Sequence, residues 1–352
     1  MNEAYRRIIT AAEEDRRDLF VSTARRVGTT EQNVEKDFWV CWTLDALFHG
    51  RPENAPRLLF KGGTALSKAF GLISRFSEDI DITVFRQDLG EFVSVDDLEK
   101  LSGKKRRAKL DAIRASCQEY LRDALQPNLG KLLADAVGHD QRESLGGLGA
   151  FFDDADPDGQ TLFLRYPSVL TADAYVRPAV RIECGAKSAL DPHLQAEVRP
   201  LVSDDVTDVD LAVAEITTIQ PTRTFWDKVV ILHGLRAWFE TRAELRQEGQ
   251  RISRHYYDLH SMFRRDIGEE ALADRALGNE CVRHARLFFN RPDFGLETAV
   301  AGHFALRPGE KMLHGLGRDY DAMTDMIIGP IPDFNDVLNS IAEIEDRLNR
   351  DE

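Results

Sequence analysis

Apolar residues recur at helical spacing near both ends of the chain. Residues 1–27 predict an opening helix rich in Arg and Glu. A second helix follows, with one apolar stripe made of Val34, Phe38, Cys41, Trp42, Leu44 and Phe48. Thr29 and Gln32 are spaced for a capping box at the start of that second helix. From Pro221, a residue suited to the first turn of a helix, the pattern stays almost wholly helical to the end.

Between these helical ends the pattern predicts a series of short strands. Apolar or alternating runs occur at residues 58–60, 79–85, 161–166, 179–184, about 193–201 and about 214–219. Helical periodicity returns over residues 93–135, and residues 139–160, rich in Gly and Asp, predict a loop or insertion. We therefore expect an α+β fold, with a mixed sheet flanked by helices in residues 1–220 and a helical domain in residues 221–352.

Composition and charge narrow the class of protein. The chain has 352 residues, of which 43% are hydrophobic, and its formal net charge of −14 argues against a surface coated with nucleic-acid-binding residues. The sequence has no signal-peptide core and no apolar run of membrane-spanning length, so we expect a cytoplasmic protein without a membrane partner. The cysteines lack the close spacing of a zinc or redox site and are expected to be buried free thiols: Cys41, Cys117, Cys184 and Cys281.

Asp79 and Asp81, in the predicted strand 79–85, are the first candidates for chemistry. Side chains of a strand alternate between its two faces, so both carboxylates project from one face while Ile80 and Ile82 point into a core. Two carboxylates on one face repel each other unless a cation neutralises them, and a hard divalent cation is their natural partner. The pair predicts a site for Mg²⁺ or Mn²⁺; the alternative is a solvated strand end.

A glycine turn precedes that strand, in the sequence Lys61-Gly62-Gly63-Thr64. Gly62 and Gly63 lack Cβ atoms, so a phosphate can approach the backbone closely. The unpaired N–H groups that open the following helix favour an anion, Thr64 adds a hydroxyl donor, and Lys61 and Lys68 add positive charge. The alternative is a tight turn capped by Thr64, but the two-carboxylate strand downstream favours a nucleotide-binding site.

Two further candidates lie downstream. Arg181 and Glu183 share one face of the predicted strand 179–184. If that strand lies beside strand 79–85, Glu183 can complete the acidic cluster and bind the metal; otherwise it pairs with a neighbouring base. A basic run, Lys104, Lys105, Arg106 and Arg107, can hold the phosphates of an RNA acceptor, although most such runs are solvated helix faces.

Residues 61–68 and 75–81 resemble the signature of the AbiEii/AbiGii nucleotidyltransferase toxins. These toxins are the toxin half of type IV toxin–antitoxin systems and belong to the DNA polymerase β-like nucleotidyltransferase superfamily. The superfamily pattern is a Gly-Gly or Gly-Ser turn, an Asp-x-Asp strand and a later strand with one more acidic residue. Thr64 stands where many relatives have Ser, which keeps the hydroxyl. The resemblance implies a nucleotidyltransferase-like fold in which Arg75 and Ser77 help to hold the triphosphate.

Two looser likenesses occur in the C-terminal half. Residues 223–228 resemble a family helix that carries an essential lysine, here Lys228, and residues 254–259 resemble the family's Arg-x-x-x-Asp-Leu segment with its functional aspartate, here Asp258. We expect Lys228 to compensate charge on the leaving pyrophosphate. Asp258 holds Lys228 or joins the acid cluster, or it pairs with Arg254 one helical turn earlier.

The expected reaction is transfer of a nucleoside monophosphate from a nucleoside triphosphate to an acceptor hydroxyl, with Asp79, Asp81 and Glu183 at the metal. The resemblance implies an RNA acceptor, a tRNA 3′ end first, and a cognate antitoxin as partner. Three alternatives remain open. The same chemistry can modify a protein hydroxyl, as in AMPylation; the chain can be a catalytically silent nucleotide-binding module; or it can be a metal-dependent phosphohydrolase with water as acceptor.

Overall fold

The computed structural model describes residues 1–77, 79–138, 147–170, 178–246 and 251–350. The chain divides into two compact units. The sheet unit comprises Met1–Ala69, Phe76–Val93 and Gly103–Thr218, and the helical unit comprises Phe70–Arg75, Ser94–Ser102 and Ile219–Glu352. The main boundary thus lies next to the one expected from the sequence, but two N-terminal segments belong to the helical unit.

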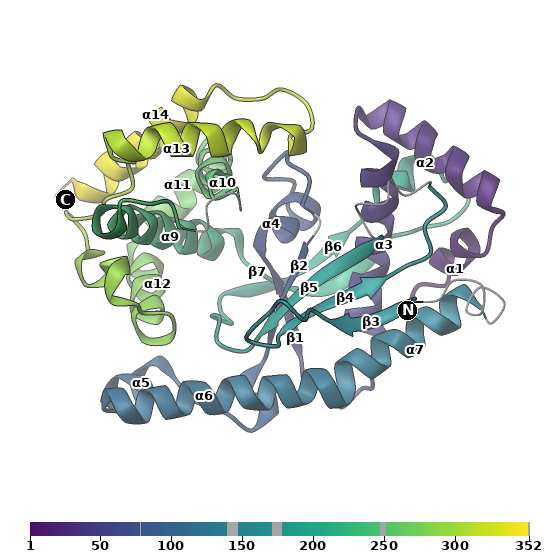
Figure 1. Ribbon diagram of the computed structural model, residues 1–352, viewed down its shortest axis with the longest axis horizontal. Coiled ribbons are helices and arrows are strands. Elements are labelled where there is room, and N and C mark those ends of the chain that lie inside the picture. The colour runs from purple at the N-terminus through teal and green to yellow at the C-terminus, as the bar shows by residue number, and fades with distance from the viewer. Residues whose placement is uncertain (78, 139–146, 171–177, 247–250, 351–352) are drawn as a thin grey trace. The chain divides into compact units, whose positions relative to one another are not determined.

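A seven-stranded mixed sheet forms the core of the sheet unit, in the order β3-β4-β5-β2-β1-β7-β6 (Figure 1). The strands are β1 (Leu58–Lys61), β2 (Asp79–Val84), β3 (Gly149–Phe152), β4 (Thr161–Arg165), β5 (Ala179–Gly185), β6 (His193–Val198) and β7 (Val213–Ile219). Strand β2 is central, because it pairs antiparallel with β1 and parallel with β5. The expected mixed sheet is therefore confirmed.

Strand β3 lies where a loop was predicted, so that part of the prediction is wrong. Its residues pair antiparallel with β4, with Phe151 opposite Phe163. Strand β4 follows β3 directly in the chain, with Phe152 opposite Leu162, but the Gly and Asp residues around β3 leave no strand signal beyond two phenylalanines. The remainder of the predicted loop includes residues 139–146, which lie outside the described residues.

The two faces of β2 differ as the alternation predicts. Ile80 and Ile82 are 0% and 1% exposed and pack in the core. Asp79 and Asp81 lie on the opposite face and are half-buried. The strand thus holds two carboxylates at the surface by fixing the intervening side chain in the core.

Three helices open the sheet unit: α1 (Ala4–Ile9), α2 (Glu13–Val27) and α3 (Glu31–His49). The single opening helix that the sequence predicts is therefore two helices. Of the predicted stripe in α3, Phe48 is half-buried and the other five residues are buried, and the N-cap is Thr30 rather than Thr29. The Thr30 hydroxyl accepts the backbone N–H of Asn33 at 3.2 Å, whereas the Thr29 hydroxyl accepts the side-chain amide of Asn33 at 3.0 Å.

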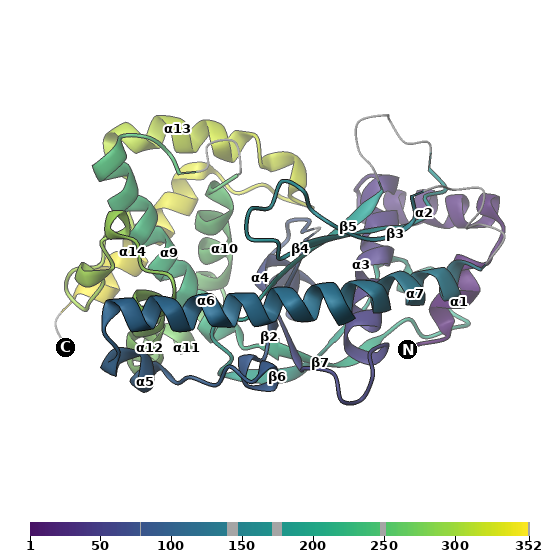
Figure 2. The ribbon, with the colours of Figure 1, turned by 60° about the horizontal axis from the view of Figure 1, so that its bottom comes forward.

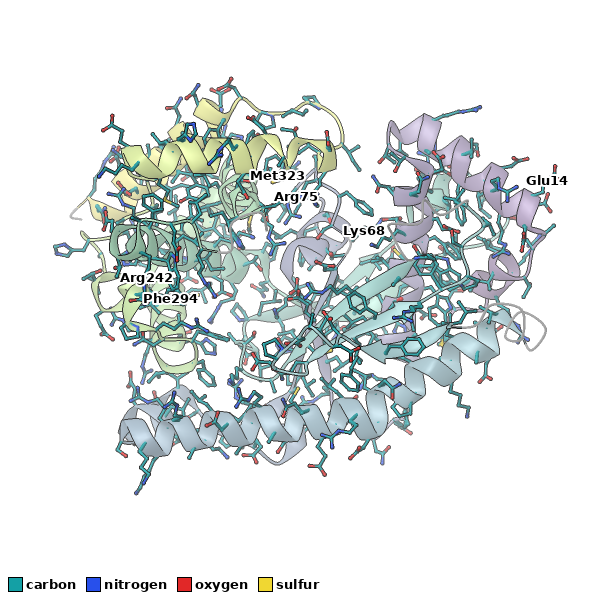
Figure 3. The ribbon with its side chains drawn as sticks, viewed as in Figure 1. Glu14, Lys68, Arg75, Arg242, Phe294 and Met323 are labelled. Carbon is teal, nitrogen blue, oxygen red and sulfur yellow. The ribbon has the colours of Figure 1, made fainter. Side chains whose placement is uncertain are left out.

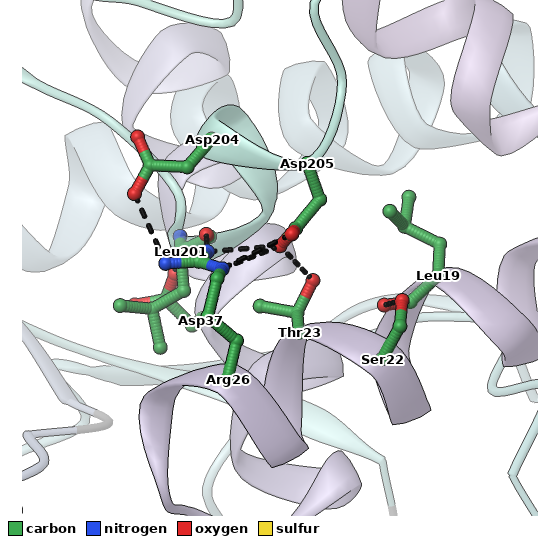
Figure 4. A network of polar contacts seen from close by, with 8 residues as sticks. All are labelled: Leu19, Ser22, Thr23, Arg26, Asp37, Leu201, Asp204 and Asp205. Carbon is green, nitrogen blue, oxygen red and sulfur yellow. Dashed lines mark hydrogen bonds and ion pairs between the residues drawn. The ribbon is translucent and has the colours of Figure 1, made fainter.

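Polar contacts fasten α2 and α3 to the turn after β6 (Figure 4). Arg26 donates to the carbonyl oxygen of Leu201 at 2.7 Å, and Asp205 accepts from both Arg26 and the Thr23 hydroxyl, the latter at 2.6 Å. From α3, Asp37 accepts the backbone N–H of Leu201 at 2.6 Å. These charge-assisted hydrogen bonds fix the helices to this edge of the sheet unit.

A long helical segment runs as one continuous rod through α6 (Gly103–Tyr120), η3 (Leu121–Leu125) and α7 (Gln126–Val137) (Figure 2). Its buried residues recur at every fourth position: Ile113, Cys117, Leu121, Leu125, Leu129, Leu133 and Val137. Because an α-helix has about 3.6 residues per turn, buried residues that repeat every four positions shift gradually around the helix axis. The wider π-helical turn at η3 corrects part of that drift. The α7 end can therefore pack against β3.

Helices make up most of the helical unit, as predicted: α5 (Val95–Lys100), α9 (Pro221–Arg242), α10 (Ser253–Phe263), α11 (Asp266–Ala273), α12 (Arg275–Phe288), α13 (Glu310–Asp321) and α14 (Phe334–Asn349). Helix α9 packs against α10, α11 and α12, burying Phe225 and Trp226. The Trp226 indole N–H donates to the carbonyl oxygen of Ala271 at 2.8 Å. Within the described part of the chain, no helix is long and apolar enough to cross a bilayer.

Specific contacts bind the two N-terminal segments into the helical unit. The carbonyl oxygen of Ser74 accepts the backbone N–H of Ile328 at 2.7 Å. In α5, Glu99 and Asp96 accept from Arg283 of α12 at 2.7 and 2.5 Å. Residues far apart in the sequence therefore share one core, which a linear division of the chain does not predict.

The four cysteines are free and buried, as predicted. Burial raises the pKa of the Cys117 thiol to about 11, and it raises the pKa of Cys41, Cys184 and Cys281 as well. Since the thiolate is the reactive form, these residues serve packing rather than catalysis.

His233 of α9 is a hydrogen-bond junction inside the helical unit. Its Nδ1 accepts the backbone N–H of Ala305 at 3.1 Å, and its Nε2 donates to the carbonyl oxygen of Gly295 at 3.1 Å. This pattern requires a neutral ring with its proton on Nε2. Burial lowers the pKa of His233 below its ordinary value.

We expect acid to destabilise the protein partly through His233. The pKa of His233 is lower in the folded state than its unfolded value of about 6.5. The stability that neutral His233 gives the folded state is therefore complete above the unfolded pKa, and it is lost as the pH falls through the folded pKa. His255 and His260 shift in the same direction, so the test compares the parent with His233→Gln. Urea unfolding should lose free energy more steeply with falling pH in the parent; equal slopes would contradict this account.

Candidate active site

The pairing of β2 with β5 gathers the predicted acidic residues on one face of the sheet. Asp81 lies opposite Glu183, and Asp79 lies opposite Arg181. On its other side β2 pairs with β1, which brings Lys61 opposite Asp81. Directly paired residues share a face of the sheet, so these five side chains form one polar surface, here called the acidic face. The condition set for Glu183, that its strand lies beside β2, is met.

Basic side chains compensate the carboxylates of the acidic face. Nη1 of Arg181 lies 3.9 Å from Oδ2 of Asp79 and donates a hydrogen bond to Oε1 of Glu183. Nζ of Lys61 lies 3.6 Å from Oδ1 of Asp81. Glu183 therefore pairs with a neighbouring base, Arg181, which is the alternative that the sequence left open.

The donor set of the acidic face suits a hard divalent cation. Asp79 and Asp81 offer half-buried carboxylate oxygens, the ligands that Mg²⁺ and Mn²⁺ prefer. Among the residues that the structure describes, no group of three His, Cys, Asp or Glu side chains is arranged to hold a metal ion. Asp79 and Asp81 thus form the candidate ligand pair, and Glu183 is engaged with Arg181.

Gly62 lets the turn after β1 pass close to Asp81. The turn consists of α4 (Gly62–Thr64), which includes Gly63, and the π-helical turn η1 (Ala65–Ala69). Gly62 has a φ of +80°, in the left-handed region that favours glycine, and a Cβ atom there would overlap the carboxylate of Asp81. The sequence predicts that Gly62 leaves room for a phosphate. The structure adds that it leaves room for the carboxylate.

Thr64 connects the glycine turn to the start of β2. Its side chain is fully buried, and its hydroxyl donates to the backbone carbonyl oxygen of Asp79. The same hydroxyl lies 2.9 Å from Oγ of Ser77, which is half-buried. The hydroxyl predicted to reach a phosphate is therefore engaged inside the protein, where it positions Asp79.

Lys68 does not add free positive charge to the glycine turn (Figure 3). Its Nζ forms an ion pair with Asp37 of α3 and donates to the carbonyl oxygen of Arg199 at 3.1 Å. Burial alone would lower the pKa of Lys68, but the Asp37 carboxylate raises it above the ordinary value. Of the two lysines singled out beside the turn, Lys61 is the one on the acidic face.

A buried ion cluster in the helical unit joins three predicted residues. Asp258 accepts from Nε and Nη2 of Arg75 at 2.7 and 2.8 Å, and from Nζ of Lys228 at 2.7 Å. Asp258 is 0% exposed, and Arg75 (Figure 3) and Lys228 are 5% and 6% exposed. Of the roles considered for Asp258, holding Lys228 is the one this geometry favours.

The buried cluster contains two cations and one anion. Burial would raise the pKa of Asp258, but Arg75 and Lys228 hold it below its usual range. Burial lowers the pKa of Lys228, Asp258 opposes that shift, and Arg75 adds to it. Within the described residues, Nδ1 of His255 finds no hydrogen-bond partner, and burial beside Lys228 lowers the pKa of its ring well below the ordinary value. The cluster therefore disfavours any further positive charge.

The basic run lies at the start of α6. Lys104, Lys105 and Arg107 are exposed, and in the described structure none of the three forms an ion pair within 4.0 Å. Arg106 is half-buried. Farther along the helix, Lys109 pairs with Glu91 at 2.6 Å. The first turn of α6 thus keeps positive charge at the surface of the sheet unit.

Sequence reasoning left Arg181 out of the candidate site. Alternation placed it on the face of Glu183, but its position opposite Asp79 depends on the register between β2 and β5. The one available signal was an arginine two residues before the candidate glutamate on the same strand.

Comparisons with known proteins point to one kind of enzyme. The family model of the nucleotidyl transferase AbiEii toxin, of type IV toxin–antitoxin systems, matches residues 45–340. The fold is similar to that of MenT4, a nucleotidyltransferase toxin from Mycobacterium tuberculosis H37Rv, with a TM-score of 0.52 and 15% sequence identity over 95% of this chain and 90% of that chain. No protein of curated function matches the sequence.

Gly62→Ala tests the close approach of the glycine turn to Asp81. Gly90 has a similar φ of +77° with nothing within 4 Å of its added Cβ, so Gly90→Ala carries only the backbone strain of about 1–2 kcal/mol. Gly62→Ala should lose at least about 1 kcal/mol more, because the Asp81 carboxylate must move. It should also lower nucleotide transfer about 100-fold, whereas Gly90→Ala should not. Equal stability and activity of the two variants would contradict this role.

Asp258→Ala tests the buried cluster. Removing the shared carboxylate leaves Arg75 and Lys228 buried without a partner and should lower the free energy of unfolding by about 3–5 kcal/mol. Lys228→Met should cost less, because Asp258 keeps both hydrogen bonds from Arg75. As a control, Asp293→Ala breaks an exposed ion pair with Arg242 and should cost no more than about 1 kcal/mol. Urea denaturation measures all three, and similar losses for Asp258→Ala and Asp293→Ala would refute this prediction.

Proposed function

The chain belongs to the nucleotidyl transferase AbiEii toxins of type IV toxin–antitoxin systems, and on that premise we propose that it transfers a nucleoside monophosphate from a nucleoside triphosphate to an RNA hydroxyl. The observation that carries the proposal is the in-register pairing of β1, β2 and β5, which sets Asp79 and Asp81 on one face beside Lys61. Two carboxylates with a basic neighbour suit a triphosphate that is bound with Mg²⁺ or Mn²⁺.

We assign Asp79 and Asp81 to hold the divalent ion, with Glu183 as the third acidic residue of the face. When bound, the ion neutralises phosphate charge and stabilises the charge that develops during transfer. The glycine turn orients both ligands, because the Thr64 hydroxyl fixes the carbonyl oxygen of Asp79 and Gly62 admits the carboxylate of Asp81. The turn therefore acts on the ligands as well as on the substrate.

The transfer step forms one bond and breaks another. The oxygen of the acceptor hydroxyl bonds to the α-phosphorus, while the bond from that phosphorus to the oxygen bridging the β-phosphate breaks. Pyrophosphate leaves with the electron pair of the broken bond, and the hydroxyl proton passes to water. Lys61, the backbone N–H groups of Gly62 and Gly63, and the Ser77 hydroxyl hold the β- and γ-phosphates.

The buried cluster of the helical unit supplies positive charge. Its two cations exceed its one anion, a balance that suits phosphate, and we propose that Lys228 binds phosphate charge within this unit. Asp258 positions Lys228 through the 2.7 Å ion pair. Arg75, expected to bind nucleotide, is assigned to fixing Asp258 through its two hydrogen bonds.

We propose an RNA acceptor, with a tRNA 3′ end first, on the resemblance of residues 61–68 and 75–81 to the family signature. The exposed charges of Lys104, Lys105 and Arg107 support it, because such side chains hold phosphates without reading sequence. A protein hydroxyl is the second candidate acceptor. The net charge of −14 favours a protein acceptor over RNA, because negative charge on the enzyme weakens binding to a polyanion.

We further propose a cognate antitoxin as partner and action in the cytoplasm, where RNA, nucleoside triphosphates and Mg²⁺ are available. Both follow from membership of a toxin–antitoxin family. The free, buried thiols of the described structure are compatible with a reducing compartment.

A transfer assay tests the proposal. The protein is incubated with each α-labelled triphosphate, total RNA and lysate protein, with and without EDTA. We expect the label to enter RNA in the tRNA size range, to need the divalent ion, and to fall at least about 1000-fold in Asp79→Ala or Asp81→Ala.

The matched control for these variants is Asp208→Asn, which removes an exposed carboxylate paired with Arg7 at the surface of the sheet unit. It should keep the parent activity. Label in protein would select the second acceptor, and triphosphate breakdown without any acceptor would select hydrolysis. Parent-level transfer by Asp79→Ala would overturn the mechanism.

A further inference from the structure

The acidic face carries an arginine between two of its carboxylates. Arg181 lies directly opposite Asp79 in the parallel pairing of β2 and β5. Its Nη1 is 3.9 Å from Oδ2 of Asp79 and donates to Oε1 of Glu183. Of the carboxylates on this face, Asp79 and Glu183 thus share one guanidinium, while Asp81 lies nearest Lys61.

The charge of Arg181 is permanent and its position is set by the sheet. A guanidinium keeps its proton at any pH that a folded protein experiences. On β5, alternation directs its side chain to the same face as Glu183, and on β2 the register brings Asp79 beside it. The side chain is 36% exposed, so core packing does not account for its placement.

Nucleotidyl transfer commonly uses two divalent ions about 3.5–4 Å apart, held by carboxylates that bridge them. A second ion needs uncompensated carboxylate oxygens. On this face Glu183 is already engaged by the Arg181 guanidinium through a hydrogen bond, so a second divalent ion placed at Glu183 would be repelled.

We propose that Arg181 takes the place of the second cation, so that the acidic face binds one divalent ion rather than two. Glu183 is then a positioning residue that holds the guanidinium, and Asp79 and Asp81 bind the single ion. Arg181 supplies the phosphates with the fixed positive charge that the second ion supplies in two-metal sites. This inference rests on the proposed nucleotide transfer and specifies which cations balance the negative charge of the carboxylates and phosphates at the site.

The test counts bound Mn²⁺ on the full chain, without nucleotide, from the electron paramagnetic resonance signal of free Mn²⁺. The parent should bind one ion per chain. Arg181→Gln, which keeps a polar side chain but removes the charge, should bind two. Arg181→Lys keeps the charge and should bind one. The control Arg199→Gln removes an exposed guanidinium paired with Glu197 in the same unit, and should bind one.

The outcomes separate this inference from the proposed function. Two ions in the parent, or one ion in both the parent and Arg181→Gln, would overturn the role of Arg181 and leave metal-dependent transfer standing. No ion in the parent would overturn the one-ion inference, and an ion that still binds the double variant Asp79→Ala/Asp81→Ala would refute the assigned ligands.

The Mg²⁺ dependence of transfer provides a second readout. The parent should follow a one-site binding curve, and Arg181→Gln should become sigmoidal with kcat lowered about 100-fold. Arg181→Lys should restore the one-site curve and part of kcat. A sigmoidal parent curve, or Arg181→Gln with the parent curve and kcat, would contradict the inference. Circular dichroism of each variant verifies that the half-exposed substitution leaves the fold intact.

Discussion

Like charges on one side of a sheet must be compensated, and this electrostatic constraint governs the acidic face. Asp79, Asp81 and Glu183 cannot share the exposed side of β2 and β5 unless positive charge lies among them. Lys61 and Arg181 provide it from the neighbouring strand positions. The same requirement makes the face suited to cations and phosphates, because carboxylates that are compensated by half-exposed side chains can also be compensated by a ligand.

The helical unit meets the same constraint in a dry environment. Asp258 is completely buried, and its ionised carboxylate is stabilised there by the two cations that donate hydrogen bonds to it. One of those cations, Arg75, comes from the segment between η1 and β2 rather than from the C-terminal half. The cluster thus fixes an N-terminal segment in the helical unit while keeping a net positive charge near Lys228.

Much of this could be predicted because the signals are local. Alternation along β2 gives the shared face of Asp79 and Asp81, and the apolar residues of α3 place that helix in the core. The rest depends on pairing between distant segments. The position of Arg181 beside Asp79 needs the register of β2 and β5, and the contact of Arg75 with Asp258 joins residues from opposite halves of the chain. The Thr64 hydroxyl was predicted to donate to a phosphate, but it donates to the carbonyl oxygen of Asp79 because the turn folds back on β2.

The account stands on Asp79 and Asp81 acting as a pair of metal ligands on the acidic face. Anomalous diffraction from crystals of the full chain soaked with Mn²⁺ tests this most directly. The account predicts anomalous density in contact with carboxylate oxygens of both Asp79 and Asp81. Density located elsewhere on the protein, with these two side chains turned from it, would contradict the account.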